Sequence, residues 1–144
     1  MDKSTLKKLN ALIQLDIDAV YCYDQAIERI EDRDIAENLQ NFRGDHEQHI
    51  DALSAIVNEN GGEPPERSPD MKGYLLQGMT ALRSASGTEG ALKAMEMNEK
   101  TTNKRYEDAQ NWVVPPDIHA VLQKNLDDEK RHLEYIQSQL HVQV

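Results

Sequence analysis

The chain has 144 residues, which is enough for one domain with a real hydrophobic core and too few for two comfortable domains. Its formal net charge of −10 argues against nucleic acid and anionic membranes as partners. The single cysteine, Cys22, excludes an internal disulfide and fits a reducing compartment. Neither a signal-peptide core nor an apolar run of membrane-spanning length occurs, so we expect a soluble cytoplasmic protein.

The first predicted helix covers about residues 4–30 and begins at Ser4, a favourable N-cap residue. Its apolar stripe steps by three and four residues, as the core-facing side of a helix does. Two polar residues, Asp16 and Tyr23, interrupt this stripe. Asp18 falls on the opposite, polar face, which we expect to be solvated.

The second predicted helix covers about residues 34–60, and Asp34 opens it as part of a capping box. Two histidines three residues apart, His46 and His49, interrupt the middle of its apolar stripe. Gly44 lies beside them. It either lets two helices approach closely or is simply tolerated.

A long connection follows, in which a short helix is predicted over about residues 69–85, after the N-cap Ser68. A tight hairpin would need only a few residues, whereas this connection is long enough to cross the whole bundle. The next helix, at about residues 88–113, would then run parallel to the second one. Its stripe is interrupted by Glu99 and Tyr106.

The last predicted helix covers about residues 117–141 and carries Glu129 and His132 in the middle of its stripe. Two ionisable groups on a buried seam need compensation, because burying them unpaired is unfavourable by several kcal/mol or more. A Glu-x-x-His pair that faces the inside of a helical bundle is half of a di-metal carboxylate ligand pattern.

The two predicted hairpins repeat at an offset of 83 residues. Advancing the first set of polar positions by 83 gives the second set: Asp16, Tyr23, His46 and His49 become Glu99, Tyr106, Glu129 and His132. Within each hairpin, the acid and the first residue of the pair stand 30 positions apart, and the turn lies midway. The six acid and histidine groups therefore lie at one level of the bundle, and the two tyrosines lie two turns from the acids.

Two interpretations of this polar layer are open. A single polar residue on an apolar seam is usually a satisfied core group, and a hydrogen-bonded layer can fix the register of a bundle. Three carboxylates that converge without a cation, however, would repel one another and raise their own pKa values. A bound metal removes that penalty, so the sequence favours a metal site.

The acid-x6-Tyr spacing on two helices, with x-x-His on the other two, resembles the ferritin-like superfamily, which includes rubrerythrins and bacterioferritins. The crossover, with its helix around Gly73-Tyr74-Leu75, looks like that of an uncharacterised bacterial ferritin-like family. The resemblance implies an all-α, ferritin-like four-helix bundle: two antiparallel hairpins joined by a long crossover with a short extra helix. It also implies a di-iron or other di-metal centre.

Carried over position by position, the resemblance assigns six metal ligands: Asp16, His46, His49, Glu99, Glu129 and His132. Tyr23 and Tyr106 would hydrogen-bond the ligand carboxylates. His46 departs from the pattern, because a second bridging glutamate belongs at its position. Glu129 is then left as the bridging carboxylate.

The function expected from this pattern is that of a metal-binding protein with a mid-bundle, di-metal site that favours iron over zinc or manganese. Oxidase or peroxide-reducing chemistry on O₂ or peroxide would follow. The absence of a Cys-x-x-Cys module would require an external electron donor. The alternative is a non-catalytic, stress-associated or structural bundle with one structural zinc or no metal. An apolar flank on the last helix, at Leu126, Leu133 and Leu140, suggests a homodimer.

Overall fold

The computed structural model describes residues 1–70 and 73–143, and all the regular secondary structure of these residues is helical. The helices in chain order are α1 (Lys3–Arg29), α2 (Arg33–Glu59), α3 (Leu76–Ser84), α4 (Gly87–Ala109) and α5 (Pro116–Gln143).

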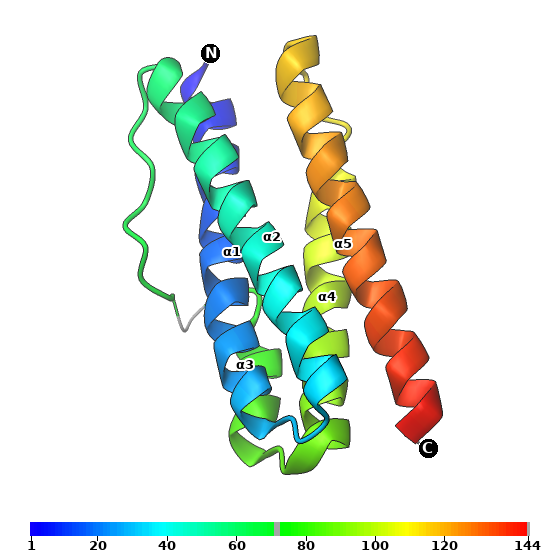
Figure 1. Cartoon of the computed structure of the whole chain (residues 1–144). Coiled ribbons are helices and arrows are strands. Elements are labelled where there is room, and N and C mark those ends of the chain that lie inside the picture. Colours follow the sequence, from blue (N-terminus) through cyan, green and yellow to red (C-terminus); the bar gives the residue numbers. More distant parts are fainter. Residues whose placement is uncertain (71–72, 144) are drawn as a thin grey trace.

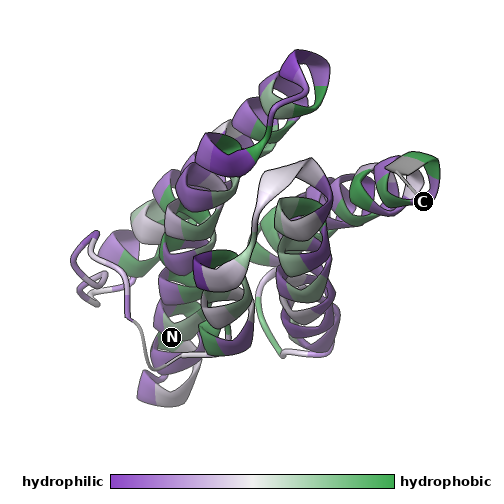
Figure 2. Cartoon of the chain, turned by 90° about the horizontal axis from the view of Figure 1, so that it is seen from below, coloured by the Kyte–Doolittle hydropathy of each residue, from purple (hydrophilic) through white to green (hydrophobic). Residues whose placement is uncertain are grey.

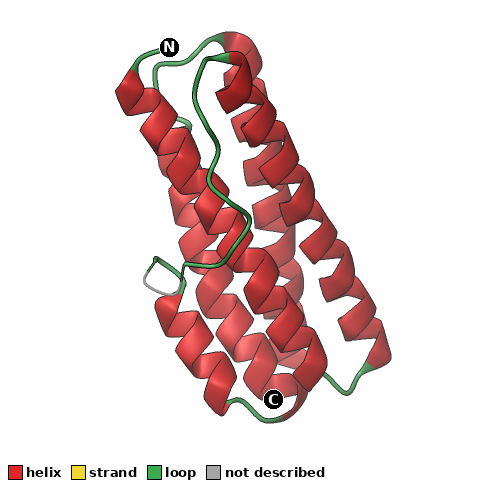
Figure 3. Cartoon of the chain, turned by 90° about the vertical axis from the view of Figure 1, so that its left-hand side faces the viewer, coloured by secondary structure: helices red, strands yellow, loops and turns green. Residues whose placement is uncertain are grey.

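The four long helices form two antiparallel hairpins, α1 with α2 and α4 with α5 (Figure 1). The hairpins pack through α1 against α4 and through α2 against α5. The crossover after α2 returns along the side of the first hairpin (Figures 1 and 3), so α2 and α4 run in the same direction. The predicted architecture, with its long crossover and short extra helix, is confirmed.

The short helix α3 packs against α4 and α1 and buries Met79 and Leu82. It begins at Leu76, later than the expected start near residue 69; residues 69 and 70 are not helical, and residues 71–72 lie outside the described part. The extended approach to α3 is tied to α1, because the Asp70 N–H donates to Asp18 Oδ1 over 2.7 Å. Asp18 is therefore buried, and the expectation that it is solvated was wrong.

Helix ends differ from the sequence expectation by a few residues. Asp2 caps α1 by accepting from the Thr5 N–H over 2.7 Å, so Ser4, the expected cap, already lies within the helix. Asp32 caps α2 in the same way, two residues before Asp34. Asp and Ser side chains are both favourable caps, so the sequence alone does not distinguish Asp2 from Ser4 or Asp32 from Asp34.

The core is mostly aliphatic and lies between the helices, where Figure 2 shows the hydrophobic sides of the ribbons. Gly44 has no atom within 4 Å of the position of a Cβ, so it is tolerated in α2 and serves no close approach. Leu126 is only 4% exposed and belongs to the core, so the expectation that it lies on an exposed apolar flank was wrong. Leu133 and Leu140 are half-buried. No described helix is both long enough and apolar enough to cross a membrane.

Candidate metal centre

Six ionisable side chains meet inside the bundle, each near the middle of its helix. Because residues three apart on a helix share a face, His46 and His49 project together from α2, as Glu129 and His132 do from α5. None of the six has any exposed surface. The structure thus brings together every ligand position expected from the sequence: Asp16 on α1, His46 and His49 on α2, Glu99 on α4, Glu129 and His132 on α5.

Two buried tyrosines bind the acids across the bundle. The Tyr23 hydroxyl of α1 donates to Glu99 Oε2 of α4 over 2.7 Å, and the Tyr106 hydroxyl of α4 donates to Asp16 Oδ2 of α1 over 2.5 Å. The pKa of each tyrosine lies well above its usual value, because burial and the adjacent carboxylate both disfavour a phenolate. Each hydroxyl therefore stays a donor that fixes one carboxylate oxygen.

His49 and His132 each turn one ring nitrogen inward and the other outward. His49 Nδ1 lies 3.1 Å from Asp16 Oδ1, while its Nε2 lies 2.9 Å from Asp128 Oδ2. His132 Nδ1 lies 3.2 Å from Glu129 Oε2, while its Nε2 lies 2.8 Å from Asp45 Oδ2. An outer carboxylate that holds one nitrogen of a histidine fixes the tautomer and leaves the other nitrogen for a metal.

The outer carboxylates, Asp45 and Asp128, are not among the site residues predicted from the sequence. A signal was present: each immediately precedes a ligand pair, and the two are separated by the same 83 residues. Arg131 joins them at the surface, since its Nη2 lies 2.8 Å from Asp45 Oδ2 and 3.1 Å from Asp128 Oδ1. This arginine neutralises part of their charge while staying half-exposed to solvent.

His46 lies between the carboxylates. Its Nδ1 is 2.6 Å from Asp16 Oδ1, and its Nε2 is 3.2 Å from Glu99 Oε2 and 3.4 Å from Glu129 Oε2. Burial lowers the pKa of His46, but the charge of Glu129 and the bonds to the other two acids outweigh burial and raise it well above its usual value. The raised pKa favours the imidazolium form of His46, whose charge would offset part of the negative charge of the three acids around it.

Among the three buried acids of the cluster, Glu129 has the least hydrogen-bond and charge compensation. Burial, and then the negative charge of Glu99, raise the pKa of Glu129 to about 7, although His46 and His132 oppose the shift. By contrast, burial of Glu99 is outweighed by the charge of His132, and its pKa lies well below its usual value. The Oε1 atom of Glu129 is buried and has no hydrogen-bond partner among the described residues.

These donors fit a metal pair. Two groups of four residues each bring one ligand atom within 4.8 Å of the others: Asp16, His46, His49 and Glu129, and His46, Glu99, Glu129 and His132. Carboxylates and imidazoles of this kind suit iron, zinc or manganese. A carboxylate can serve two ions at once, whereas a neutral imidazole serves one, so Glu129, which belongs to both groups, could be a shared ligand. Its unpartnered oxygen is the atom that a cation would satisfy.

The comparison with family profiles gives one match, to the family described as Domain of unknown function (DUF2383), over residues 4–112. The chain belongs to this family. The match covers α1 from its second residue together with α2, α3 and α4, so it spans the positions of Asp16, His46, His49 and Glu99 but ends before α5. No curated protein matches the chain.

Among solved structures, the chain is similar to the bacterioferritin-related protein from Bacteroides fragilis, described as a dodecameric thioferritin. The TM-score is 0.79 with 19% sequence identity, and the match covers 98% of this chain and 87% of that one. At this identity the likeness establishes the fold alone, and the expected ferritin-like bundle is confirmed. A buried cluster with the residue types of a metal site lies inside that fold.

Proposed function

We propose that this protein binds two divalent metal ions at the middle of the bundle, and that iron is its metal. The observation that carries the proposal is the pair of overlapping, fully buried ligand groups that share His46 and Glu129. The ligands are those of the first hairpin, Asp16, His46 and His49, and those of the second, Glu99, Glu129 and His132.

The protein's own residues prepare the site in three ways. The aliphatic core excludes bulk water, which strengthens the electrostatic interactions of the buried donors. Tyr23 and Tyr106 orient the two acids, and Asp45 and Asp128 orient the two outer histidines. Bound iron would supply the change between two and three positive charges that oxidase or peroxide-reducing chemistry needs.

A non-catalytic bundle is the second candidate, and one observation favours it. His46 already contacts three carboxylates, so the metal-free cluster has an internal cation and its acids are partly compensated. Such a layer would hold the register of the bundle without a metal, or with one structural zinc.

The deciding experiment measures metal per chain. The protein is purified without chelator and dialysed anaerobically against Fe²⁺, Mn²⁺ or Zn²⁺, followed by elemental analysis. We expect two iron ions per chain and, after addition of air or peroxide, a new near-ultraviolet absorbance. One zinc per chain, or no metal and no rise in melting temperature, would instead support the structural bundle.

A matched pair of histidine variants tests whether the metal binds at this cluster. His46→Gln removes a ligand common to both groups, whereas His141→Gln changes an exposed histidine at the end of α5. We expect His46→Gln to lose metal and His141→Gln to keep it. Equal binding by both variants would place the metal elsewhere.

Three further features belong to the same proposal. A cytoplasmic location suits a chain whose only cysteine, Cys22, is buried with a pKa raised to about 12 by burial and by the charge of Asp18. Redox turnover would need an external electron donor. The Bacteroides fragilis protein is described as a dodecamer, and for this chain we propose self-association as a homodimer through the side of α5 that carries Leu133 and Leu140.

A further inference from the structure

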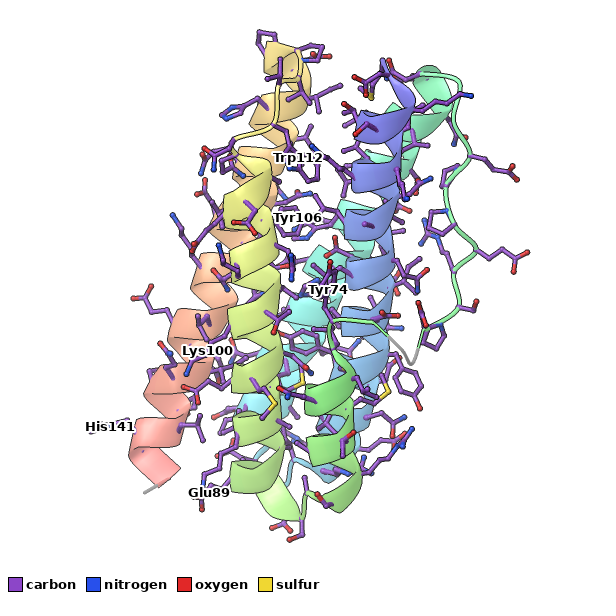
Figure 4. The ribbon with its side chains drawn as sticks, turned by 180° about the vertical axis from the view of Figure 1, so that it is seen from behind. Tyr74, Glu89, Lys100, Tyr106, Trp112 and His141 are labelled. Atoms are coloured by element: carbon purple, nitrogen blue, oxygen red, sulfur yellow. The ribbon has the colours of Figure 1, made fainter. Side chains whose placement is uncertain are left out.

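A pocket lies in the groove between α1 and α4, in the part that α3 leaves uncovered. Its volume is about 210 Å³, and Leu12 and Leu15 of α1 supply buried apolar lining. Figure 4 shows Trp112 near the end of α4 and Tyr74 just before α3, both in this groove. Two aromatic rings and two leucines thus line an open, mainly apolar pocket on the side of the bundle.

Two cations also line the pocket, and each lies against an aromatic ring. Arg105 Cζ is 3.7 Å from the centre of the Tyr74 ring, and Lys8 Nζ is 5.7 Å from the centre of the Trp112 ring. Neither cation forms a salt bridge with a residue that the structure describes. Arg105 Nε is buried and has no hydrogen-bond partner among those residues. The pocket is thus lined by two cations that lack a salt-bridge partner among the described residues.

The pocket contains one acid, Asp108, which is already paired. Its Oδ1 accepts from Lys104 Nζ over 2.7 Å on the surface of α4. The charge that the pocket presents to a ligand is therefore positive. A buried donor without an acceptor is costly, so an anion that reaches Arg105 would relieve a penalty as well as gain an ion pair.

We propose that this pocket binds a small aromatic carboxylate. The carboxylate would be held by Arg105 and Lys8, and the ring would pack on the leucines and the aromatic side chains. A volume of about 210 Å³ suits a one-ring compound and lies below the ~300 Å³ at which pockets for drug-sized ligands begin. This site is separate from the metal centre and contains none of its ligands.

Trp112 is the only tryptophan of the chain, so its fluorescence reports on the pocket directly. The full-length protein is titrated with benzoate and, in parallel, with benzamide, which has the same shape and no charge. We expect benzoate to give a saturable change with a dissociation constant in about the millimolar range, and benzamide to bind at least about tenfold more weakly. A response that does not saturate, or equal binding of the two compounds, would overturn the proposal.

Four variants test the two cations. Arg105→Gln and Lys8→Gln alter the pocket, whereas Lys100→Gln and Lys7→Gln remove exposed charges from α4 and α1 that do not line it. We expect each pocket variant to weaken benzoate binding about tenfold, as loss of a charged hydrogen bond does, and the controls to stay within about twofold. If the pocket and control variants lost benzoate affinity equally, the effect would be one of net charge, and the proposed site would be rejected.

Circular dichroism and metal content separate this result from other causes. All four variants should keep the helical signal and bind as much metal as the unmodified chain. Lys8 is exposed, so its variant tests the pocket even if Arg105→Gln disturbs the contact with Tyr74. Normal metal binding with no benzoate binding would reject this inference and leave the proposed function standing.

Discussion

Asp128 shows how one residue outside the ligand set controls the cluster. It accepts from His49 Nε2 over 2.9 Å, and this bond leaves Nδ1 facing inward. We expect Asp128→Asn to weaken metal binding by about 10- to 100-fold, the usual effect of losing such an orienting partner. Isothermal titration with Zn²⁺ measures the change.

The neighbouring Asp127 provides the control for this prediction. It is exposed and lies one residue away on the same helix. Asp127→Asn removes the same charge without touching the histidine, so its metal affinity should equal that of the unmodified chain. If both variants lost affinity equally, the outer hydrogen bond would have no special part in metal binding.

Tyr23 supports the cluster from the other side. Its hydroxyl donates to Glu99 Oε2, and both groups are fully buried. Tyr23→Phe leaves that carboxylate with one donor fewer, and we expect the free energy of unfolding to fall by about 1–3 kcal/mol. Urea denaturation of the metal-free protein measures the loss.

Tyr21→Phe is the corresponding control. Tyr21 is half-buried, and its hydroxyl makes no hydrogen bond to a residue that the structure describes. The change should leave stability within about 0.5 kcal/mol. Stabilities that differ little between the two variants would mean that the buried bond of Tyr23 contributes nothing measurable.

Most of the polar residues of the cluster were predictable from the sequence, because each one interrupts an apolar stripe. Asp45 and Asp128 escaped it because they flank the stripe and their helices alone do not bury them; they reach the histidines only across the α2–α5 contact. The burial of Asp18 was not predicted, for a similar reason. The crossover covers this residue, and the helical pattern of α1 does not indicate that contact.

At Gly78, helix α3 lies close to α4. A Cβ placed on Gly78 would lie 1.6 Å from Asn98 Oδ1 of α4, and Asn98 is buried. In Gly78→Ala, either the buried Asn98 side chain must move or the two helices must separate, and we expect a loss of about 1–3 kcal/mol in unfolding free energy. Thermal denaturation gives the value.

Gly44→Ala is the opposite case on α2. Nothing lies within 4 Å of its Cβ position, and alanine favours the helix by about 1 kcal/mol over glycine. This variant should be more stable than the unmodified chain. A loss of stability in Gly44→Ala, or none in Gly78→Ala, would contradict the packing described for these helices.

Helical periodicity predicted which helices exist, but it did not predict the residues at which they begin and end. The segment before α3 is tied to α1 by the Asp70 bond to Asp18, which joins positions 52 apart in the chain and which the helical pattern does not indicate. The cap of α1 falls on Asp2, although Ser4 has an equally suitable side chain. Such choices are made by contacts that are distant in sequence.

For the whole molecule, metal should act as a link between the two hairpins. Each hairpin supplies three of the six ligands, and unfolding separates them. We expect Zn²⁺ or anaerobic Fe²⁺ to raise the unfolding free energy, by about 2.7 kcal/mol when the free ion is at 100 times its dissociation constant. The shift in urea midpoint measures this linkage.

Glu129→Gln tests the same link. The amide resembles the uncharged form that burial favours, since the pKa of Glu129 is raised to about 7, so the metal-free variant should be at least as stable as the unmodified chain. The gain on adding metal should disappear, because the shared carboxylate is lost. An undiminished gain would remove Glu129 from the metal site.

The bundle topology itself was predictable, because the 83-residue repeat located two hairpins and the length of the crossover fixed their relative direction. The charge state of the layer was not. It depends on His46 lying within 3.4 Å of all three acids, and spacing along a helix does not determine such distances across the bundle.

The two tyrosine bonds are equivalent under the 83-residue repeat. Tyr23 corresponds to Tyr106 and Glu99 to Asp16, so the bond from Tyr23 to Glu99 has its counterpart in the bond from Tyr106 to Asp16. Two identical single hairpins, paired about a rotation axis, would make the same bonds. Such a symmetric ancestor would need the same residue at both equivalent positions. Within one chain that constraint is absent, and the two ligand groups differ: one contains Asp16 and His49, the other Glu99 and His132. If each group binds one ion, we expect the two positions to differ in affinity and to fill in a fixed order.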